Sequence, residues 1–274
     1  MSNYTDEKVA NLVQNFSVSG KFKSQKRNGT GNVNDTIVVE LDENVGSNKY
    51  TLQRINHHVF KNPEQLMYNY SRVTQHIKSK GKQNTLSLIP SKLGNTFFRD
   101  EENSFWRMMP YIEGVCCYEV AESPLHAYEA AKAFGDFQVS LSDLPGEPLN
   151  LTIPDFHNTL KRFYEYEKSK SYNFENRSEE TADLDYFILQ REHLCTAIET
   201  NKLPVRIVHN DTKLNNVLLD ENTGEGVSVI DLDTVMPGCV LHDFGDLVRT
   251  ICNSSDESEK DLSKVYFKLE FFKS

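Results

Sequence analysis

The chain has 274 residues and a formal net charge of −10, with 38% hydrophobic and 26% charged residues. These values describe an ordinary globular chain that forms one large domain or two lobes sharing a cleft. The acidic balance and the absence of a dense Lys/Arg run argue against a general nucleic-acid binder. No apolar stretch in the sequence approaches the length that spans a bilayer.

The cysteines indicate a reducing environment. The chain has five of them, an odd number, and none form a C-x-x-C pair. Free thiols are therefore favoured over a disulfide framework or a metal site. Residues 1–8 have neither the basic flank nor the apolar core of a signal peptide. We expect a cytoplasmic protein with no nucleic-acid or membrane partner, and the sequence leaves its oligomeric state open.

The first part of the chain predicts a β-rich lobe. Apolar side chains at helical spacing predict a helix over residues 5–16. Asn62 fits the N-cap, Pro63 the first turn and Gly81 the end of a second helix. Three strands, this helix and two more strands make the order of a kinase-type N-terminal lobe. The strands are expected over residues 22–27, 36–41, 49–55, 85–93 and 105–112.

The remainder of the sequence is mainly helical in pattern. Helices are expected over residues 125–141, 154–170, 179–201 and 242–252, and short strands over residues 205–208, 217–219 and 227–230. The fold class is therefore α+β: a bilobal protein-kinase-like fold, with a nucleotide-binding lobe over residues 1–112 and a mostly helical catalytic and acceptor-binding lobe over residues 113–274. Residues 265–272 are aromatic-rich and lie close to the last residue, so we expect either a C-terminally truncated chain or a tail that packs in an unusual way.

One motif carries most of the functional information. Residues 209–216 read His-Asn-Asp-Thr-Lys-Leu-Asn-Asn, so that Asp211 and Asn216 are five apart, and Asp231 follows Asp211 by twenty residues. Protein kinases place their catalytic Asp and a metal-binding Asn at the same spacing. Phosphoryl transfer needs a carboxylate that orients the acceptor hydroxyl and oxygen ligands that hold Mg²⁺ on the ATP phosphates. The pattern therefore predicts a kinase that acts on a small molecule.

Each polar residue of this motif has a predicted role. Asp211 is the expected catalytic base or hydroxyl-orienting group, and Lys213 lies where it can neutralise the moving phosphoryl group. Asn216 and Asp231 offer the hard oxygen ligands that Mg²⁺ prefers. Asp233 shares a strand face with Asp231, because strand side chains alternate. It is expected to contact either a second metal ion or only a metal-bound water.

Residues 243–245 spell the Asp-Phe-Gly that binds metal in protein kinases. They follow Asp211 by 32 residues, which is too far for that role. We therefore expect Asp243 and Asp246 to cap the following helix and to brace the motif loop. His209 is expected to hold the loop by packing and hydrogen bonding.

The turn before the second predicted strand is a candidate phosphate-binding element. It contains Gly29, Gly31, Asn32 and Asn34. Its strand–turn–strand context excludes a Walker P-loop, which joins a strand to a helix and carries G-K-[ST]. We expect a flexible turn over the ATP phosphates, with Asn32 and Asn34 as backbone or side-chain donors.

The third predicted strand offers a cation for the phosphates. Kinases usually place a lysine there, whereas this chain has Gln53-Arg54. Arg54 can bridge phosphate oxygens with two donors, so it is the expected clamp for the α- and β-phosphates. Its acidic partner is left open, because Glu64 lies earlier in the helix than a kinase would place it.

Met109, Tyr111 and Ile112 lie at the end of the fifth predicted strand and are expected to form the hinge that holds adenine. Pro110 has no backbone N–H, so Tyr111 or Ile112 must donate to the ring. The order of the lobe favours this interpretation over an ordinary strand exit.

Several segments resemble one family. Residues 207–216 and 230–238, the latter reading Ile-Asp-Leu-Asp-Thr-Val-Met-Pro-Gly, are similar to the aminoglycoside phosphotransferase and choline-kinase-like superfamily. More narrowly, they look like the bacterial N-acetylhexosamine 1-kinases. The same similarity extends over most of the chain and includes residues 31–36, 52–56 and 243–246 with Arg249 behind them.

This resemblance implies Mg²⁺- and ATP-dependent phosphorylation of the anomeric hydroxyl of N-acetylglucosamine or N-acetylgalactosamine. It implies Asp211 as the base, with Asn216 and Asp231 on the metal. Members of the family usually continue past Phe272 with helices that help to close the sugar pocket.

The motif leaves other functions open. The acceptor is alternatively choline, homoserine, methylthioribose or an aminoglycoside, and cationic acceptors need a pocket lined with carboxylates. A non-catalytic nucleotide-binding scaffold is a different class of function, although every catalytic residue type is present. A kinase of protein substrates is less favoured, because no convincing activation segment lies between Asp231 and Asp243.

Overall fold

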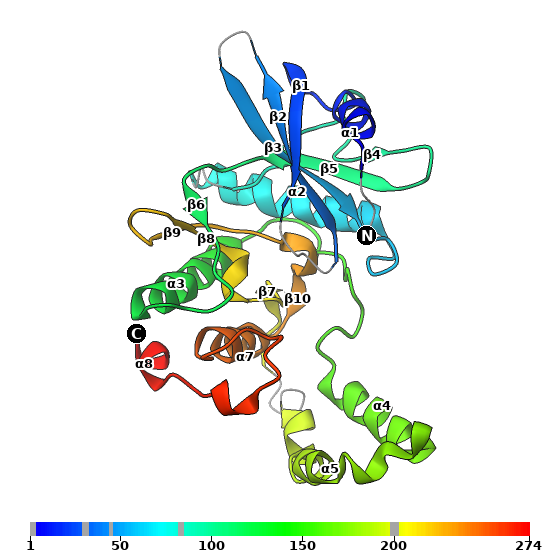
Figure 1. Ribbon diagram of the computed structural model, residues 1–274, viewed down its shortest axis with the longest axis vertical. Helices are drawn as coiled ribbons and strands as arrows, with labels where there is room; N and C mark the ends of the chain where they lie inside the picture. Colours follow the sequence, from blue (N-terminus) through cyan, green and yellow to red (C-terminus); the bar gives the residue numbers. More distant parts are fainter. Residues whose placement is uncertain (1–3, 29–32, 44–45, 82–84, 198–202) are drawn as a thin grey trace.

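The computed structural model describes residues 4–28, 33–43, 46–81, 85–197 and 203–274. It is an α+β fold with a β-sheet lobe at one end and a largely helical lobe at the other (Figure 1). The predicted kinase-like arrangement is therefore confirmed. None of the described helices combines the length and the apolar character needed to cross a membrane.

A five-stranded antiparallel sheet forms the N-terminal lobe, with strand order β1-β2-β3-β5-β4. Residues 22–27, 36–41 and 49–55 were expected to form a meander, and they do so with slightly longer strands. The elements are α1 (Asp6–Val13), β1 (Lys21–Arg27), β2 (Asp35–Asp42), β3 (Ser47–Ile55), α2 (Pro63–Ser79), β4 (Phe98–Arg99) and β5 (Phe105–Pro110).

The two helices of this lobe cover opposite faces of the sheet. Strand alternation places Ile37, Leu52 and Met108 on one face, where they pack with α1 in a buried cluster. Ile55 and Met109 lie on the other face and pack with α2. The face on which a strand residue lies therefore decides which helix it meets, and this determines the position of each candidate phosphate-binding cation.

The second helix begins and ends close to the predicted residues. The Asn62 side chain accepts a hydrogen bond from Gln65 N at 3.1 Å, and Pro63 is the first helical residue. Gly81 follows the helix with a φ of 80°, in the left-handed region that favours glycine.

The predicted strand over residues 85–93 is wrong. This segment makes only isolated bridges, Ile89 with Met108 and Ser91 with Phe16. Pro90 lies between the two bridging residues and has no N–H to continue a ladder. The fourth strand of the sheet is instead the short β4, which pairs with β5.

The C-terminal lobe combines helices with two small sheets, β6-β8-β9 and β7-β10. The hairpin of β8 and β9 that the sequence predicts is present. The elements are β6 (Val115–Cys116), α3 (Pro124–Leu141), α4 (Thr159–Tyr172), η1 (Phe174–Glu179), α5 (Ala182–Leu189), η2 (Glu192–Thr196), β7 (Arg206–Val208), η3 (Leu214–Asn216), β8 (Val217–Asp220), β9 (Gly226–Val229), η4 (Leu232–Thr234), β10 (Met236–Gly238), α7 (Val240–Ile251), η5 (Leu262–Lys264) and α8 (Leu269–Lys273).

Two predicted helices differ from the structure. The helix expected from residue 154 begins at Thr159, because Asn158 caps it by accepting from Lys161 N at 2.9 Å. The helix expected over residues 179–201 is divided into α5 and η2, and residues 198–201 lie outside the described part. Most of the large apolar side chains of α5 remain exposed, so no buried face holds a single long helix together.

The aromatic segment near the last residue packs only in part. Phe271 on α8 is buried in a core cluster with α3 and β8. Lys268 donates its backbone N–H to Cys252 O at 2.7 Å and its Nζ to Ala121 O at 3.1 Å. Tyr266 and Phe272 are exposed. This segment is therefore attached to the lobe by Phe271 and by main-chain acceptors.

One buried cluster joins the two lobes. It contains α2 residues, Met109 from β5, α3 residues and the η4 segment. The division at residue 112 stays a prediction, since apolar packing continues across it. The buried members are Tyr70, Val73, Ile77, Met109, Phe137, Leu141, Leu149, Leu232 and Val235.

Candidate active site

The motif loop, residues 209–216, begins where β7 ends. A Cβ added to Gly238 of β10 would lie 2.6 Å from Val208 Cγ2 of β7, so the close approach of these strands requires glycine. Asn210 then turns with a φ of 66° and donates Nδ2 to Thr234 O at 2.9 Å. Asparagine is among the residues that tolerate this left-handed conformation.

Three predicted residues meet in the motif loop. Asn216 Nδ2 donates to Asp211 Oδ2 at 3.0 Å and to Asp211 O at 2.8 Å. Lys213 Nζ lies 3.6 Å from Asp211 Oδ1, and these two side chains are 29% and 27% exposed. The structure therefore brings together the predicted base, the predicted cation and one predicted metal ligand. Because the amide nitrogen of Asn216 is used by Asp211, its oxygen is the atom left for a metal ion.

Asp231 follows β9 and precedes η4, with a φ of 57°. The residue as a whole is exposed. The pKa of Asp231 is raised to about 7, first by desolvation of its carboxyl group among the surrounding protein atoms and then by the negative charge of Asp233, while Arg107 opposes the shift. A divalent cation would favour the ionised form of such a carboxyl group. The donor set of Asn216 and Asp231 therefore fits Mg²⁺.

Asp233 lies in a different environment from Asp231. Its side chain is 2% exposed and forms a two-point salt bridge with Arg107 of β5: Nη1 contacts Oδ1, and Nη2 lies 3.0 Å from Oδ2. Asn34 Nδ2 also donates to Oδ2 at 2.6 Å. Both carboxylate oxygens are therefore already engaged by side chains of the N-terminal lobe, and the metal role of Asp233 stays a prediction.

The structure does not bring Arg54 to the motif residues. Its Nε and Nη2 donate to Asp35 Oδ2 at 2.9 and 2.7 Å, on the face of the sheet that α1 covers. The neighbouring Gln53 faces the other way and accepts from Arg107 Nε at 2.9 Å. The cation of the sheet that contacts a predicted site residue is thus Arg107, which bonds to Asp233. Sequence reasoning missed it, although an arginine in the middle of the apolar segment Phe105–Pro110 signals a buried partner.

The predicted phosphate-binding turn is described only in part. Gly29, Gly31 and Asn32 lie outside the described residues. Asn34 is described, and its Oδ1 accepts from Asn56 N at 3.0 Å while its Nδ2 reaches Asp233. Asn34 therefore connects the end of the turn to the segment after β9.

The hinge segment leaves one predicted donor available. Met109 is buried, and its Sδ accepts from Tyr70 Oη at 3.0 Å, so its side chain serves the core. Tyr111 N donates to Lys49 O at 3.2 Å. Among the described residues no partner is recorded for Ile112 N, which makes it the candidate adenine donor of this segment.

Asp243 braces the motif loop, as expected. Its carboxylate accepts from His209 N at 2.9 Å and from Asn210 N at 2.7 Å. Its backbone carbonyl accepts from Thr212 Oγ1 at 2.6 Å. The expected capping role is wrong, because Asp243 and Asp246 lie inside α7, which begins at Val240.

His209 also has the structural role that the sequence predicts. It is fully buried, with Nε2 2.9 Å from Ile230 O. The rings of Phe134 and Phe137 meet its imidazole edge-on. This packing joins the motif loop to α3 and to the segment before Asp231.

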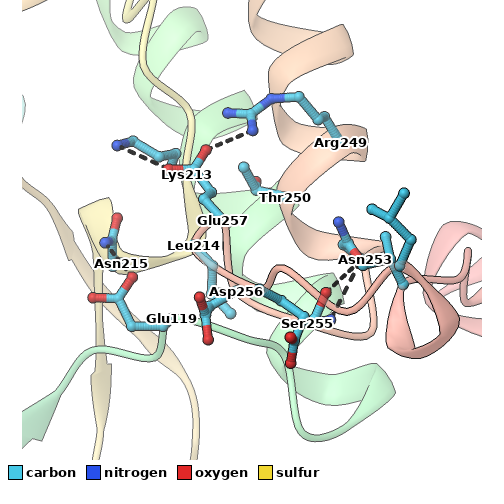
Figure 2. A pocket seen from close by; sticks show the side chains of 13 residues that line it. Glu119, Lys213, Leu214, Asn215, Arg249, Thr250, Asn253, Ser255, Asp256 and Glu257 are labelled. Atoms are coloured by element: carbon cyan, nitrogen blue, oxygen red, sulfur yellow. Dashed lines mark hydrogen bonds and ion pairs between the residues drawn. The ribbon is translucent and has the colours of Figure 1, made fainter. Parts of the chain in front are cut away.

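Beside Lys213 lies a hollow of about 250 Å³ that the sequence did not predict (Figure 2). Glu257 bridges two cations there: its Oε2 lies 3.8 Å from Lys213 Nζ and its Oε1 lies 2.5 Å from Arg249 Nη1. No single motif indicates the hollow, since its walls come from three distant segments. The lining residues are Glu119, Lys213, Leu214, Asn215, Arg249, Thr250, Asn253, Ser255, Asp256, Glu257, Glu259, Leu262 and Val265.

Comparison with known proteins supports the family suggested by the motif. The phosphotransferase enzyme family matches residues 24–266. Among solved structures, an aminoglycoside phosphotransferase from Alicyclobacillus acidocaldarius is 13% identical with a TM-score of 0.60, covering 87% of this chain and 70% of that one. A choline kinase from Cryptosporidium parvum is 14% identical with a TM-score of 0.57, covering 98% and 75%.

A third solved structure, a spectinomycin phosphotransferase in complex with ADP and spectinomycin, is 11% identical with a TM-score of 0.56, covering 86% of this chain and 71% of that one. At these identities the structural likeness establishes the fold. The family match spans most of the chain, including the motif loop and Asp231. The chain therefore belongs to the phosphotransferase enzyme family.

Proposed function

We propose that the chain transfers the γ-phosphoryl group of Mg-ATP to the anomeric hydroxyl of N-acetylglucosamine or N-acetylgalactosamine. The observation that supports phosphoryl transfer most directly is the contact of Asp211 with both Lys213 and Asn216 in one loop. Asp231 follows the β8–β9 hairpin that comes after this loop. The choice of sugar rests on the resemblance of the motif segments to N-acetylhexosamine 1-kinases.

In this proposal Asp211 acts on the acceptor hydroxyl. Oδ2 accepts from Asn216, which fixes the carboxylate, while within the described part of the chain Oδ1 has only Lys213, at 3.6 Å, and can accept the hydroxyl proton. The acceptor oxygen forms a bond to the γ-phosphorus as the bond from that phosphorus to the bridging oxygen breaks, and ADP leaves. No covalent enzyme intermediate is needed, because positioning and charge neutralisation supply most of the rate.

Asn216 and Asp231 would hold the metal ion through an amide oxygen and a carboxylate. When bound there, Mg²⁺ would neutralise charge on the phosphate oxygens. Lys213, which is 29% exposed and lies 3.6 Å from Asp211 Oδ1, would supply a second positive charge. Ile112 N would donate to adenine, because the Tyr111 N–H is already used.

A second acceptor class is favoured by one observation. Four carboxylates, Glu119, Asp256, Glu257 and Glu259, line the hollow beside Lys213, against the two cations Lys213 and Arg249 (Figure 2). An acceptor that carries an ammonium group beside its hydroxyl would be attracted there, whereas a neutral acetamido sugar would gain less. The second candidate is therefore an amine-bearing alcohol.

Phosphorus NMR of the protein with Mg-ATP and a panel of acceptors tests both candidates. The panel contains N-acetylglucosamine, N-acetylgalactosamine, choline, homoserine, methylthioribose and an aminoglycoside, and Asp211→Asn serves as the blank. An anomeric sugar phosphate that forms only with wild-type protein supports the proposal. A phosphate ester of an amine-bearing acceptor supports the second candidate instead. Nucleotide binding without any product contradicts both and favours a non-catalytic scaffold.

A further inference from the structure

We propose that Arg107, acting through Asp233, is a positioning residue that aligns Asp231 for Mg-nucleotide. This inference rests on the proposed function, since it concerns how the nucleotide site is assembled. The role differs from the phosphate clamp that the sequence pattern predicts for Arg54, because Arg107 acts on the protein and not on the nucleotide.

Arg107 is held too deeply to touch a nucleotide itself. Its side chain is 1% exposed, and its guanidinium lies 4.9 Å from the centre of the Tyr70 ring on α2. Its Nε donates to Gln53 Oε1, which leaves Nη1 and Nη2 for Asp233. Three elements of the N-terminal lobe, β3, β5 and α2, therefore fix one guanidinium group whose two terminal nitrogens point at the C-terminal lobe.

Asp233 collects contacts from separate parts of the molecule. Besides the two bonds from Arg107, its Oδ2 accepts from Asn34, at the end of the phosphate-binding turn. Its backbone carbonyl accepts from Thr152 Oγ1 at 2.9 Å, in the segment that connects α3 to α4. A carboxylate whose position is fixed from both lobes also fixes the main chain next to it.

That main chain includes the proposed metal ligand. Asp231 stands two residues before Asp233, in a left-handed conformation that begins η4, and Leu232 between them is 2% exposed. Of these three residues, Asp231 is exposed and the other two are buried. By holding Asp233, Arg107 therefore fixes the main chain that carries the Asp231 carboxylate.

The test measures nucleotide binding calorimetrically, with ADP in the presence and in the absence of Mg²⁺, for Asp233→Asn, Arg107→Met and the double variant. Loss of a partner that orients a metal ligand lowers metal affinity on the order of 10- to 100-fold. Each single variant is expected to weaken Mg-ADP by that factor and to leave metal-free ADP unchanged. The double variant is expected to be no weaker than the singles, because both residues act through one contact.

Controls separate positioning from other roles. Arg99→Met, on the exposed part of the same sheet, makes the same substitution outside the pair and is expected to bind like wild type. The Arg107→Met variant leaves a buried charge without its partner, which destabilises proteins strongly. The double variant removes both charges, so it can still be tested if Arg107→Met does not fold. Thermal melting is recorded for every variant to show which of them fold.

The alternatives give different patterns. If Asp233 binds metal directly, Asp233→Asn loses Mg-ADP affinity while Arg107→Met keeps it. If the pair only supports the fold, affinities for Mg-ADP and metal-free ADP fall together. A double variant with wild-type Mg-ADP affinity also overturns the inference. A wild-type protein that binds no nucleotide overturns both this inference and the proposed function, whereas normal wild-type binding with unaffected variants overturns the inference alone.

Discussion

The two carboxylate oxygens of Asp211 differ in what they contact. Oδ2 accepts a hydrogen bond from the Asn216 amide at 3.0 Å. Both residues belong to the motif loop, so this hydrogen bond is local. Oδ1 lies 3.6 Å from Lys213 Nζ, too far for a strong hydrogen bond. One oxygen therefore orients the group, and the other can accept a proton.

The substitution Asp211→Asn removes the proton acceptor and keeps the shape of the side chain. We expect kcat to fall on the order of 10²- to 10⁴-fold, the contribution that a positioned base makes, while nucleotide affinity stays within about twofold. Steady-state kinetics and calorimetric ADP titration measure the two quantities. Asp183→Asn, an exposed residue of α5, is the matched control. Wild-type kcat in Asp211→Asn would remove Asp211 from the role of base.

At the scale of residues, the sequence predicted contacts between residues that are close together in the chain. Asp211, Lys213 and Asn216 lie within six residues, so their spacing alone indicates that they meet. Arg107 and Asp233 are 126 residues apart, and no pattern pairs them. Arg54 was chosen because it stands on the third strand, but strand alternation turns it toward Asp35 and α1. Which of two adjacent residues faces the site depends on register, and a single sequence determines register poorly.

Among the elements, α7 supports the motif loop through Asp243. Asp243 is 3% exposed, and its carboxylate accepts from two consecutive backbone N–H groups of the loop. Gln138 Nε2 of α3 also donates to it at 2.6 Å. The loop therefore depends on a helix that follows it by more than twenty residues.

Asp243→Ala leaves those two buried N–H groups without an acceptor. Each unsatisfied group costs about 1–3 kcal/mol, so we expect a loss of roughly 3 kcal/mol in the free energy of unfolding. Urea titration followed by far-UV circular dichroism measures it, with Asp183→Ala as the exposed control. Equal stabilities of the two variants would contradict the bracing role.

A second pair of elements is joined by charge. Asp143, after α3, contacts Lys80 and lies 3.0 Å from His76 Nε2 at the end of α2. Hydrogen bonds from Lys80 and then His76 lower the pKa of Asp143 to about 2. Because the folded-state pKa lies below the ordinary value, the stabilisation is present above pH about 4 and is lost as pH falls toward 2.

The variant Asp143→Asn is therefore expected to be less stable than wild type at pH 6, with the difference shrinking toward zero between pH 4 and pH 2. Urea midpoints measured at several pH values follow this difference. Because the Asp143 side chain is largely exposed, high salt is expected to reduce it as well. A difference that is independent of pH would show that the charge on Asp143 does not join the helices.

Elements were predicted best where a local signal marks their ends. Asn62 and Pro63 begin α2 as expected, because the capping hydrogen bond lies within four residues. The segment over residues 85–93 has the composition of a strand but contains Pro90 and makes only isolated bridges. The helix expected over 179–201 has apolar residues at helical spacing, yet α5 finds no buried face to pack against.

On the scale of the whole molecule, the lobes share a core. Phe137 of α3 is 6% exposed and belongs to the cluster that also contains Tyr70 of α2 and Met109 of β5. The Arg107–Asp233 pair crosses the same region. Packing of this kind predicts that the lobes unfold as one unit.

The single tryptophan, Trp106, is fully buried in the N-terminal lobe and reports on it, whereas circular dichroism is dominated by the helices of the other lobe. We expect both signals to give the same urea midpoint. Phe137→Ala is expected to lower stability by about 3–5 kcal/mol and to shift both signals together. Phe174→Ala, at 82% exposure, is the matched control. Midpoints that differ between the signals would indicate that the lobes unfold separately.

The contact between Gly238 and Val208 limits how this chain can vary. Any side chain at position 238 would push β10 away from β7 and shift the start of the motif loop, since Cβ would lie 2.6 Å from Val208 Cγ2. Gly245 in α7 has open space around it and no unusual φ, so alanine there is compatible with the helix. In a library randomised at both positions and selected for activity, survivors should retain glycine at 238 and accept many residues at 245.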